Sequence, residues 1–265
     1  MHSKKHLGQY FLKNPEILRI LADSLNLKSG DLVIEIGPGH GELTEVLRMM
    51  NYLPTGDVPK GHELRIMGIE KDTELAMELK KKFQKNKNIE IICGDILKIL
   101  PTIPHPYKLA GNIPYYITGH LLRIISELKE KPDIAVLTIQ KEVAERICAV
   151  PPSMNLLAAS VQVWARSKII RTVSKNEFSP RPKVDSAVIK LITLPKNKSL
   201  TTEFYYPFIR ALFKQPRKTV LNNLKTFKIP QETLLGLLKQ HGVDPHSRPQ
   251  DLDVQTIKNL ARDVV

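Results

Sequence analysis

A glycine-rich turn between an apolar strand and an amphipathic helix limits the possible folds of this chain more than any other feature. Residues 31–36, Asp-Leu-Val-Ile-Glu-Ile, predict a short buried strand that runs directly into Gly-Pro-Gly-His-Gly at 37–41. Residues 42–50 then carry the apolar spacing of a helix. Glycines let a backbone approach a ligand closely, and the first turn of a helix offers free amide donors. The segment therefore predicts a nucleotide-type binding turn in an α/β domain.

Strands and helices alternate on both sides of this turn. An amphipathic helix is expected before it, at 15–27, with Asn14 as its N-cap. A charged helix is expected at 74–85. Further apolar runs predict strands at 64–69, 89–92, 108–111, 134–139 and 187–194. Such alternation is typical of a mainly parallel sheet with helices on both faces, so we expect an α/β, Rossmann-like domain over residues 1–194.

The pattern changes to helices alone beyond Pro195. Polar and proline-marked breaks separate the candidate helices, at 204–214, 220–224, 231–241 and 254–264. We therefore expect a small all-helical C-terminal domain over residues 195–265.

Carboxylates follow two of the predicted strands, at the ends where parallel sheets bind their ligands. Glu70 can accept hydrogen bonds from two ribose hydroxyl groups, and Asp95 can bind an adenine amino group. A dinucleotide dehydrogenase is one alternative, but its fingerprint is G-x-G-x-x-G, whereas Gly37, Gly39 and Gly41 are spaced as G-x-G-x-G. We favour S-adenosylmethionine as the cofactor, because it brings a ribose and an adenine and carries no phosphate.

The sequence Asn112-Ile113-Pro114-Tyr115 follows the predicted strand at 108–111. The Asn112 side chain and the Ile113 carbonyl can both accept hydrogen bonds, and Pro114 stiffens the backbone between them and the aromatic ring. Tyr115 offers a flat face to a base that has left its stack. These residues predict chemistry on the amino group of a nucleobase.

Positive charge is concentrated in parts of the chain. Lys and Arg together number 40 against 27 Asp and Glu, a net charge of +13. A generally basic proteome would explain the total, but the excess is uneven. It is dense between residues 166 and 190, and again after residue 196. Phosphate backbone is the expected partner of such patches.

The two cysteines and the lengths of the apolar runs indicate which compartment the sequence predicts and whether it predicts a metal site. Cys93 and Cys148 are too few for a disulfide framework or a zinc site, so we expect both to be small buried hydrophobic residues. The sequence shows neither a signal peptide nor an apolar run that approaches the roughly 18 residues of a membrane helix. We expect a soluble, cytoplasmic protein that holds no metal.

Six motifs in the same order resemble those of the ribosomal RNA adenine dimethyltransferases, and they cover nearly the whole chain. The match is best for the small-subunit enzymes of that family. The motifs lie at Lys4–Leu12, Glu35–Thr44, Gln140–Arg146, Phe178–Ser186, Phe213–Lys218 and Arg248–Leu252, in addition to the tetrad at 112–115.

The resemblance implies a class I S-adenosylmethionine-dependent methyltransferase. Its implied substrate is a pair of adjacent adenosines in the 3′-terminal hairpin of small-subunit ribosomal RNA, presented by an immature 30S subunit to a monomeric enzyme. Tyr115 and Phe178 would sandwich the target adenine. The implied RNA contacts are Arg181, Lys183, Arg217 and Lys218. The implied cofactor contacts are Tyr10, Leu12, Gly37, Gly39, Glu70, Asp95 and Asn112.

The chain departs from the family pattern at Tyr10, where the family usually has Asn or His, and at Pro216, which replaces an arginine. The segment after Ile147 is also shorter than usual, and the stretch 49–63 is a long insertion that we expect to be an exposed loop. Two alternatives remain. One is the sister enzyme that methylates a single large-subunit adenine and confers macrolide resistance, and the other is a non-catalytic RNA-binding assembly factor on the same fold.

Overall fold

The computed structural model describes residues 9–50, 64–195 and 202–264. Most of the insertion at 49–63, and the start of the motif at 4–12, lie outside this part of the chain. The strands are β1 (Phe11–Leu12), β2 (Leu32–Ile36), β3 (Arg65–Glu70), β4 (Ile89–Cys93), β5 (Lys108–Asn112), β6 (Ile134–Gln140), β7 (Ala165–Val173), β8 (Phe178–Ser179) and β9 (Ser186–Thr193).

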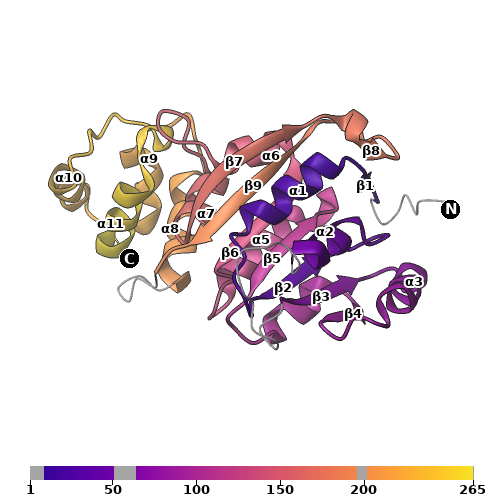
Figure 1. The fold of residues 1–265 in the computed structure, drawn as a ribbon. Coiled ribbons are helices and arrows are strands. Elements are labelled where there is room, and N and C mark those ends of the chain that lie inside the picture. The colour runs from indigo at the N-terminus through magenta and orange to yellow at the C-terminus, as the bar shows by residue number, and fades with distance from the viewer. Residues whose placement is uncertain (1–8, 51–63, 196–201, 265) are drawn as a thin grey trace. The chain divides into compact units, whose positions relative to one another are not determined.

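Helices separate most of these strands and make up most of the C-terminal part (Figure 1). They are α1 (Pro15–Ser24), α2 (Glu42–Met50), α3 (Thr73–Phe83), α4 (Ile96–Ile99), α5 (Thr118–Glu127), α6 (Lys141–Ile147), α7 (Leu156–Gln162), α8 (Thr202–Leu212), α9 (Val220–Leu224), α10 (Gln231–Gln240) and α11 (Val254–Val264).

Within the described residues, seven strands form one sheet in the order β4-β3-β2-β5-β6-β9-β7. The pairs β4–β3, β3–β2, β2–β5 and β5–β6 are parallel, and β9 is antiparallel to β6. The strand order reverses between β2 and β5. In open parallel sheets, ligands bind at the carboxyl ends of the strands beside such a reversal. The topology therefore places the ends of β2 and β5, and so the glycine turn and Asn112, at the expected ligand site.

Local sequence explains why α1 covers one face of this sheet. Asn14 caps the helix, its side chain accepting from the amides of Glu16 and Ile17, and Pro15 begins it. The apolar side of the helix is buried against residues from the strands and α2, among them Val33, Ala110 and Val136. The helix ends at Ser24, earlier than the predicted residue 27, because Asn26 adopts a left-handed conformation (φ 50°).

The chain divides into two units. One holds residues 1–144 and 168–193, and the other holds residues 145–167 and 194–265. One boundary between the units lies near 194, and residues 145–167 belong to the C-terminal unit, whereas the sequence predicts a continuous domain over 1–194. The cause of this difference is tertiary packing: α7 buries Ala158 and Ala159 in the core of that unit, and the Tyr205 hydroxyl donates to the Ala159 carbonyl at 3.0 Å.

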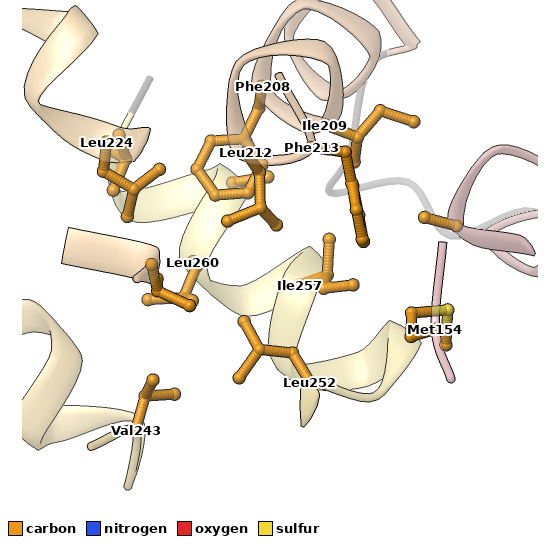
Figure 2. Packing of buried hydrophobic residues seen from close by; sticks show 14 of the residues in the cluster. Met154, Phe208, Ile209, Leu212, Phe213, Leu224, Val243, Leu252, Ile257 and Leu260 are labelled. Atoms are coloured by element: carbon orange, nitrogen blue, oxygen red, sulfur yellow. The ribbon is translucent and has the colours of Figure 1, made fainter. Parts of the chain in front are cut away.

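The core of the C-terminal unit is built from side chains of α8, α9, α10 and α11. Figure 2 shows Phe208, Leu212, Ile257 and Leu260 converging there, with Met154 at the edge of the cluster. This unit is mainly helical, as predicted.

Two sequence expectations differ from the structure. The strand β7 and the helices α5 and α7 were not predicted. Cys93 is exposed and Cys148 is partly exposed, so the prediction that both are buried is wrong. Cys93 ends β4, an edge strand of the sheet, and at such an edge no neighbouring strand covers the chain.

Candidate active site

A cavity opens at the carboxyl ends of β2, β3 and β5. Nine of the predicted site residues line it, together with others such as Lys71 and Tyr116. Those nine are Tyr10, Gly37, Gly39, Glu70, Asp95, Asn112, Ile113, Pro114 and Tyr115.

The glycine turn forms one wall of this cavity and is tied to β3. Gly37, Gly39 and Gly41 all have positive φ angles, of 60°, 62° and 85°. The Gly39 amide donates to Oε2 of Glu70 at 3.0 Å, and the Asp72 amide donates to Oε1 at 2.9 Å. At Gly39 a Cβ atom would also lie 3.0 Å from the ring of Phe11. A side chain at Gly39 is therefore disfavoured for two reasons. The backbone there has a positive φ angle, and the Phe11 ring leaves little room for a Cβ atom.

Glu70 is held in place at the end of β3. The side chain is buried, and burial raises the pKa of its carboxyl, although the amides of Asp72 and Gly39 act in the opposite direction. Each carboxylate oxygen has two lone-pair sites, so one on each remains for a ligand hydroxyl. The Glu70 carboxylate can therefore accept hydrogen bonds from two vicinal hydroxyl groups of a ligand.

Glu35 supports the turn from behind. It is buried in β2, and Thr44 of α2 donates its hydroxyl to Oε2 at 2.7 Å. Burial raises the pKa of Glu35 to about 8. The residue links the strand to the helix that follows the turn and is not among the described residues that line the cavity.

Asp95 also lines the cavity and already has two partners. It caps α4 by accepting from the Leu97 amide at 3.0 Å, and Lys71 donates to its other oxygen at 2.9 Å. Burial alone would raise the pKa of Asp95, but Lys71 and the Leu97 amide outweigh it, and the pKa lies below its usual value. Lys71 was not predicted as a site residue, although it directly follows Glu70.

Asn112 ends β5 and is oriented by the N-terminal segment. Its Nδ2 atom donates to the carbonyl oxygen of Tyr10 at 2.5 Å. A carbonyl can only accept, so the amide must turn its nitrogen toward Tyr10 and its Oδ1 atom away from it. The next residue, Ile113, donates its amide to the Thr138 carbonyl at 3.0 Å, which anchors the tetrad to β6.

Tyr115 is fixed from two sides. Its hydroxyl lies 2.8 Å from Oγ of Ser186, a buried residue at the start of β9. Its ring lies against the ring of Tyr10, with centroids 5.5 Å apart and planes tilted by 33°. Neither contact was predicted. Ser186 belongs to the motif at 178–186, but only the pairing of β9 with β6 brings it to the tetrad.

Leu12 and Phe178 lie apart from the other predicted site residues. They face each other in the antiparallel pair of β1 and β8, and both side chains are buried in the core cluster beneath α1. Neither is among the described residues that line the cavity. Phe178 is 5% exposed in this structure, and its stacking on the target adenine stays a prediction.

The predicted RNA contacts are exposed in both units. Arg181 and Lys183 follow β8 in the first unit, and Arg217 and Lys218 lie in the loop between α8 and α9 in the second. Asn223 organises that loop, since its Nδ2 atom donates to the carbonyls of Gln215 and Thr219, at 3.1 Å each, and of Lys218. Asn223 was not singled out from the sequence, where nothing distinguishes it from other polar residues of a helix.

Sheet order, glycine turn and carboxylates together define a Rossmann-like methyltransferase domain that uses S-adenosylmethionine. A solved dimethyladenosine transferase from Plasmodium falciparum superposes on the chain with a TM-score of 0.78, at 27% identity over 94% of this chain and 95% of that one. The 23S rRNA methyltransferase ErmE has the same fold, with a TM-score of 0.77 at 23% identity over 96% of this chain and 99% of that one.

Sequence comparison narrows this class to one family. The model of the family described as ribosomal RNA adenine dimethylase matches residues 1–263. Proteins named ribosomal RNA small subunit methyltransferase A are 35% identical in Dehalococcoides mccartyi strain CBDB1 and 36% identical in Clostridium botulinum strain Langeland. The alignments cover 98% and 97% of this chain and 88% and 92% of those relatives.

The chain belongs to the ribosomal RNA adenine dimethylase family. It is therefore an S-adenosylmethionine-dependent enzyme that methylates adenine in ribosomal RNA. Among the described residues, no helix is long and apolar enough to cross a membrane, and no cluster of His, Cys, Asp and Glu could hold a metal ion.

Proposed function

We propose that this enzyme dimethylates N6 of two adjacent adenosines in the 3′-terminal hairpin of small-subunit ribosomal RNA. The single observation that carries the chemistry is the hydrogen bond from Asn112 Nδ2 to the Tyr10 carbonyl, which leaves Oδ1 of Asn112 to accept from an adenine amine. The names of the relatives, which are small-subunit methyltransferases, support the choice of RNA.

The exocyclic amine of adenine needs help to react, because its lone pair is delocalised into the ring. In our proposal Oδ1 of Asn112 and the carbonyl oxygen of Ile113 each accept one of its hydrogens. Two acceptors held in fixed positions favour a pyramidal nitrogen and direct its lone pair toward the reacting carbon. Pro114 stiffens the backbone between these acceptors and Tyr115, whose ring stacks on the base.

S-adenosylmethionine supplies the methyl group together with a sulfonium that can leave as a neutral thioether. With the cofactor bound, the methyl group would pass to the nitrogen as its bond to sulfur breaks, and the nitrogen would lose one proton to solvent. Only one hydrogen remains for the second transfer, so one of the two acceptors has no donor in that round.

Most of the cofactor contacts that we propose are residues that line the cavity. The backbone of Gly37 and Gly39 approaches the cofactor closely, Glu70 accepts from its ribose hydroxyls, and Asp95 accepts from its adenine amine. Tyr10 contributes through its backbone. Leu12 is assigned an indirect part, as a buried residue that supports the segment.

The RNA contacts that we propose are Arg181 and Lys183 in the first unit and, separately, Arg217 and Lys218 in the second, each binding phosphates of an immature 30S subunit. We further propose that the enzyme acts as a monomer and, since ribosomal subunits are its substrate, in the cytoplasm.

The decisive experiment is methylation of under-methylated small ribosomal subunits with labelled S-adenosylmethionine, followed by mapping of the modified bases. We expect dimethyladenosine at two adjacent positions near the 3′ end of the small-subunit RNA. Label in large-subunit RNA, or monomethyladenine alone, would contradict the proposal and favour the large-subunit activity. Calorimetry with S-adenosylmethionine is the companion test, since absence of binding would indicate a non-catalytic assembly factor.

A further inference from the structure

Lys71 joins the carboxyl ends of two neighbouring strands at the cavity. It directly follows Glu70, the last residue of β3, and its Nζ atom donates to Oδ2 of Asp95, which lies just beyond the end of β4, at 2.9 Å. Lys71 and Asp95 both line the cavity, and among the described residues that do so Lys71 is the only cation. The ion pair is therefore part of the surface that a ligand in the cavity meets.

Asp95 is held at both of its carboxylate oxygens. Oδ1 accepts from the Leu97 amide at 3.0 Å, and Oδ2 accepts from Lys71. The amide alone would hold only one oxygen, and the torsion at the end of an aspartate side chain is broad, so the carboxylate could rotate. With both partners in place, its plane is fixed. Each oxygen keeps one further lone-pair site, so an acceptor remains available to a donor in the cavity.

Lys71 also keeps Asp95 in the form that can only accept hydrogen bonds. The Asp95 side chain is 24% exposed, and partial burial disfavours its charge. Lys71 and the Leu97 amide outweigh this effect, and the pKa of Asp95 lies below its usual value. The pKa of Lys71 is raised in turn, chiefly because its ammonium donates to Asp95. An ionised carboxylate has no proton to donate, so it favours a ligand group that donates, such as an amine.

The contribution of this pair to folding is small. The Lys71 side chain is 52% exposed, and ion pairs at such positions add little to the free energy of unfolding. Its main effect is on the acceptor that Asp95 presents to the cavity.

We propose that Lys71 is a positioning residue for the cofactor, whose ammonium fixes the Asp95 carboxylate so that it presents an acceptor to the amino group of the cofactor adenine. This inference rests on the proposed contact between Asp95 and that amine. Lys71 acts through Asp95 and needs no contact of its own with the cofactor. It raises the affinity for S-adenosylmethionine and for its demethylated product, S-adenosylhomocysteine, and takes no part in methyl transfer.

The test compares two ligands by calorimetry on the full-length enzyme. One is S-adenosylhomocysteine, and the other is its des-amino analogue, which carries hydrogen in place of the adenine amine. Lys71→Met keeps an unbranched side chain of similar length and removes the ammonium. We expect this variant to bind S-adenosylhomocysteine about 3- to 5-fold more weakly, the upper part of the range for a partly exposed ion pair. It should bind the analogue as the wild type does, because the analogue has no amine for Asp95 to hold.

Two further variants complete the binding series. Lys71→Arg keeps the positive charge and should bind S-adenosylhomocysteine within about 1.5-fold of the wild type. Lys80→Met is the matched control, because Lys80 is exposed on α3, and it should bind both ligands as the wild type does. In steady-state kinetics of Lys71→Met, KM for S-adenosylmethionine should rise about 3- to 5-fold, while kcat at saturating cofactor stays at the wild-type value.

Equal affinities of Lys71→Met and the wild type for S-adenosylhomocysteine would overturn the proposal. An equal loss for both ligands would also overturn it, since the effect would then come from the methylene groups of Lys71 and not from its charge. Asp95→Asn, which keeps an acceptor for the Leu97 amide, separates this inference from the proposed cofactor contact. Wild-type affinity in Asp95→Asn would refute that contact together with the inference. Weaker binding in Asp95→Asn, with no effect of Lys71→Met, would refute the role of Lys71 alone.

Discussion

The hydroxyl group of Tyr115 lies 2.8 Å from Oγ of Ser186, a residue 71 positions later in the chain. Because Ser186 is buried at the start of β9, its position is set by the sheet. The hydrogen bond therefore transfers the rigidity of the sheet to the ring that is proposed to stack on the target base.

Loss of the Tyr115 hydroxyl and loss of the Ser186 hydroxyl should lower kcat/KM to a similar extent, because either change breaks the same hydrogen bond. We expect Tyr115→Phe and Ser186→Ala each to lower kcat/KM by about 2- to 10-fold, since a neutral hydrogen bond is worth roughly 0.5–1.5 kcal/mol. The double variant should be no worse than the poorer single variant, because both remove one interaction. Steady-state kinetics of the three proteins measures this, and additive losses would show that the two residues act independently.

Asn112→Ala should nearly abolish turnover, because the adenine amine loses one acceptor and its lone pair is no longer directed. RNA affinity should stay within a few-fold of the wild-type value, since phosphate contacts dominate binding. Single-turnover methylation and a filter-binding titration provide the two measurements. A large loss of RNA binding would contradict the role assigned to Asn112.

Glu70→Gln should weaken binding of S-adenosylmethionine at least tenfold. An amide has one acceptor oxygen in place of two, and the backbone amides of Gly39 and Asp72 already require both. Calorimetry is the measurement. Glu78→Gln, an exposed position on α3, is the matched control and should bind as the wild type does. Equal affinities for all three proteins would rule out a ribose contact at Glu70.

Glu35 should make the protein less stable as pH rises. Its pKa is about 8 in the folded protein against an ordinary 4.5, so between these values the folded state holds a proton that the unfolded chain has lost. The free energy of unfolding should therefore fall from about pH 5 to about pH 8, by at most about 1.4 kcal/mol per pH unit. Glu35→Gln, which cannot ionise, should flatten this dependence. Denaturant unfolding at three pH values tests this, and identical slopes for the two proteins would disprove it.

Arg217→Ala and Lys218→Ala should each weaken RNA binding about equally for all sequences. Each should also reduce the slope of log affinity against log salt concentration by about one, as expected for a phosphate contact. Lys239→Ala is the control, because Lys239 is exposed on α10 of the same unit. An unchanged salt slope in the first two variants would exclude direct phosphate contacts.

The sequence by itself was enough for the alternation of elements, the glycine turn and the carboxylates at the strand ends. These features depend on local patterns, on the conformational freedom of glycine and on the periodicity of buried side chains, all of which are visible along the chain. It was also enough to place Asn112 and Tyr115 beside the turn, because parallel strands bring their carboxyl ends to one edge.

Tertiary structure alone decided which side chains meet at that edge. The orientation of Asn112 depends on a carbonyl 102 positions away, and that of Tyr115 on Ser186. Phe178 belongs to the motif at 178–186, and its ring is buried in the core cluster beneath α1, which the motif by itself does not reveal. Contacts between residues so far apart in sequence depend on the register of strands and on competition for burial, and neither is set by any local segment.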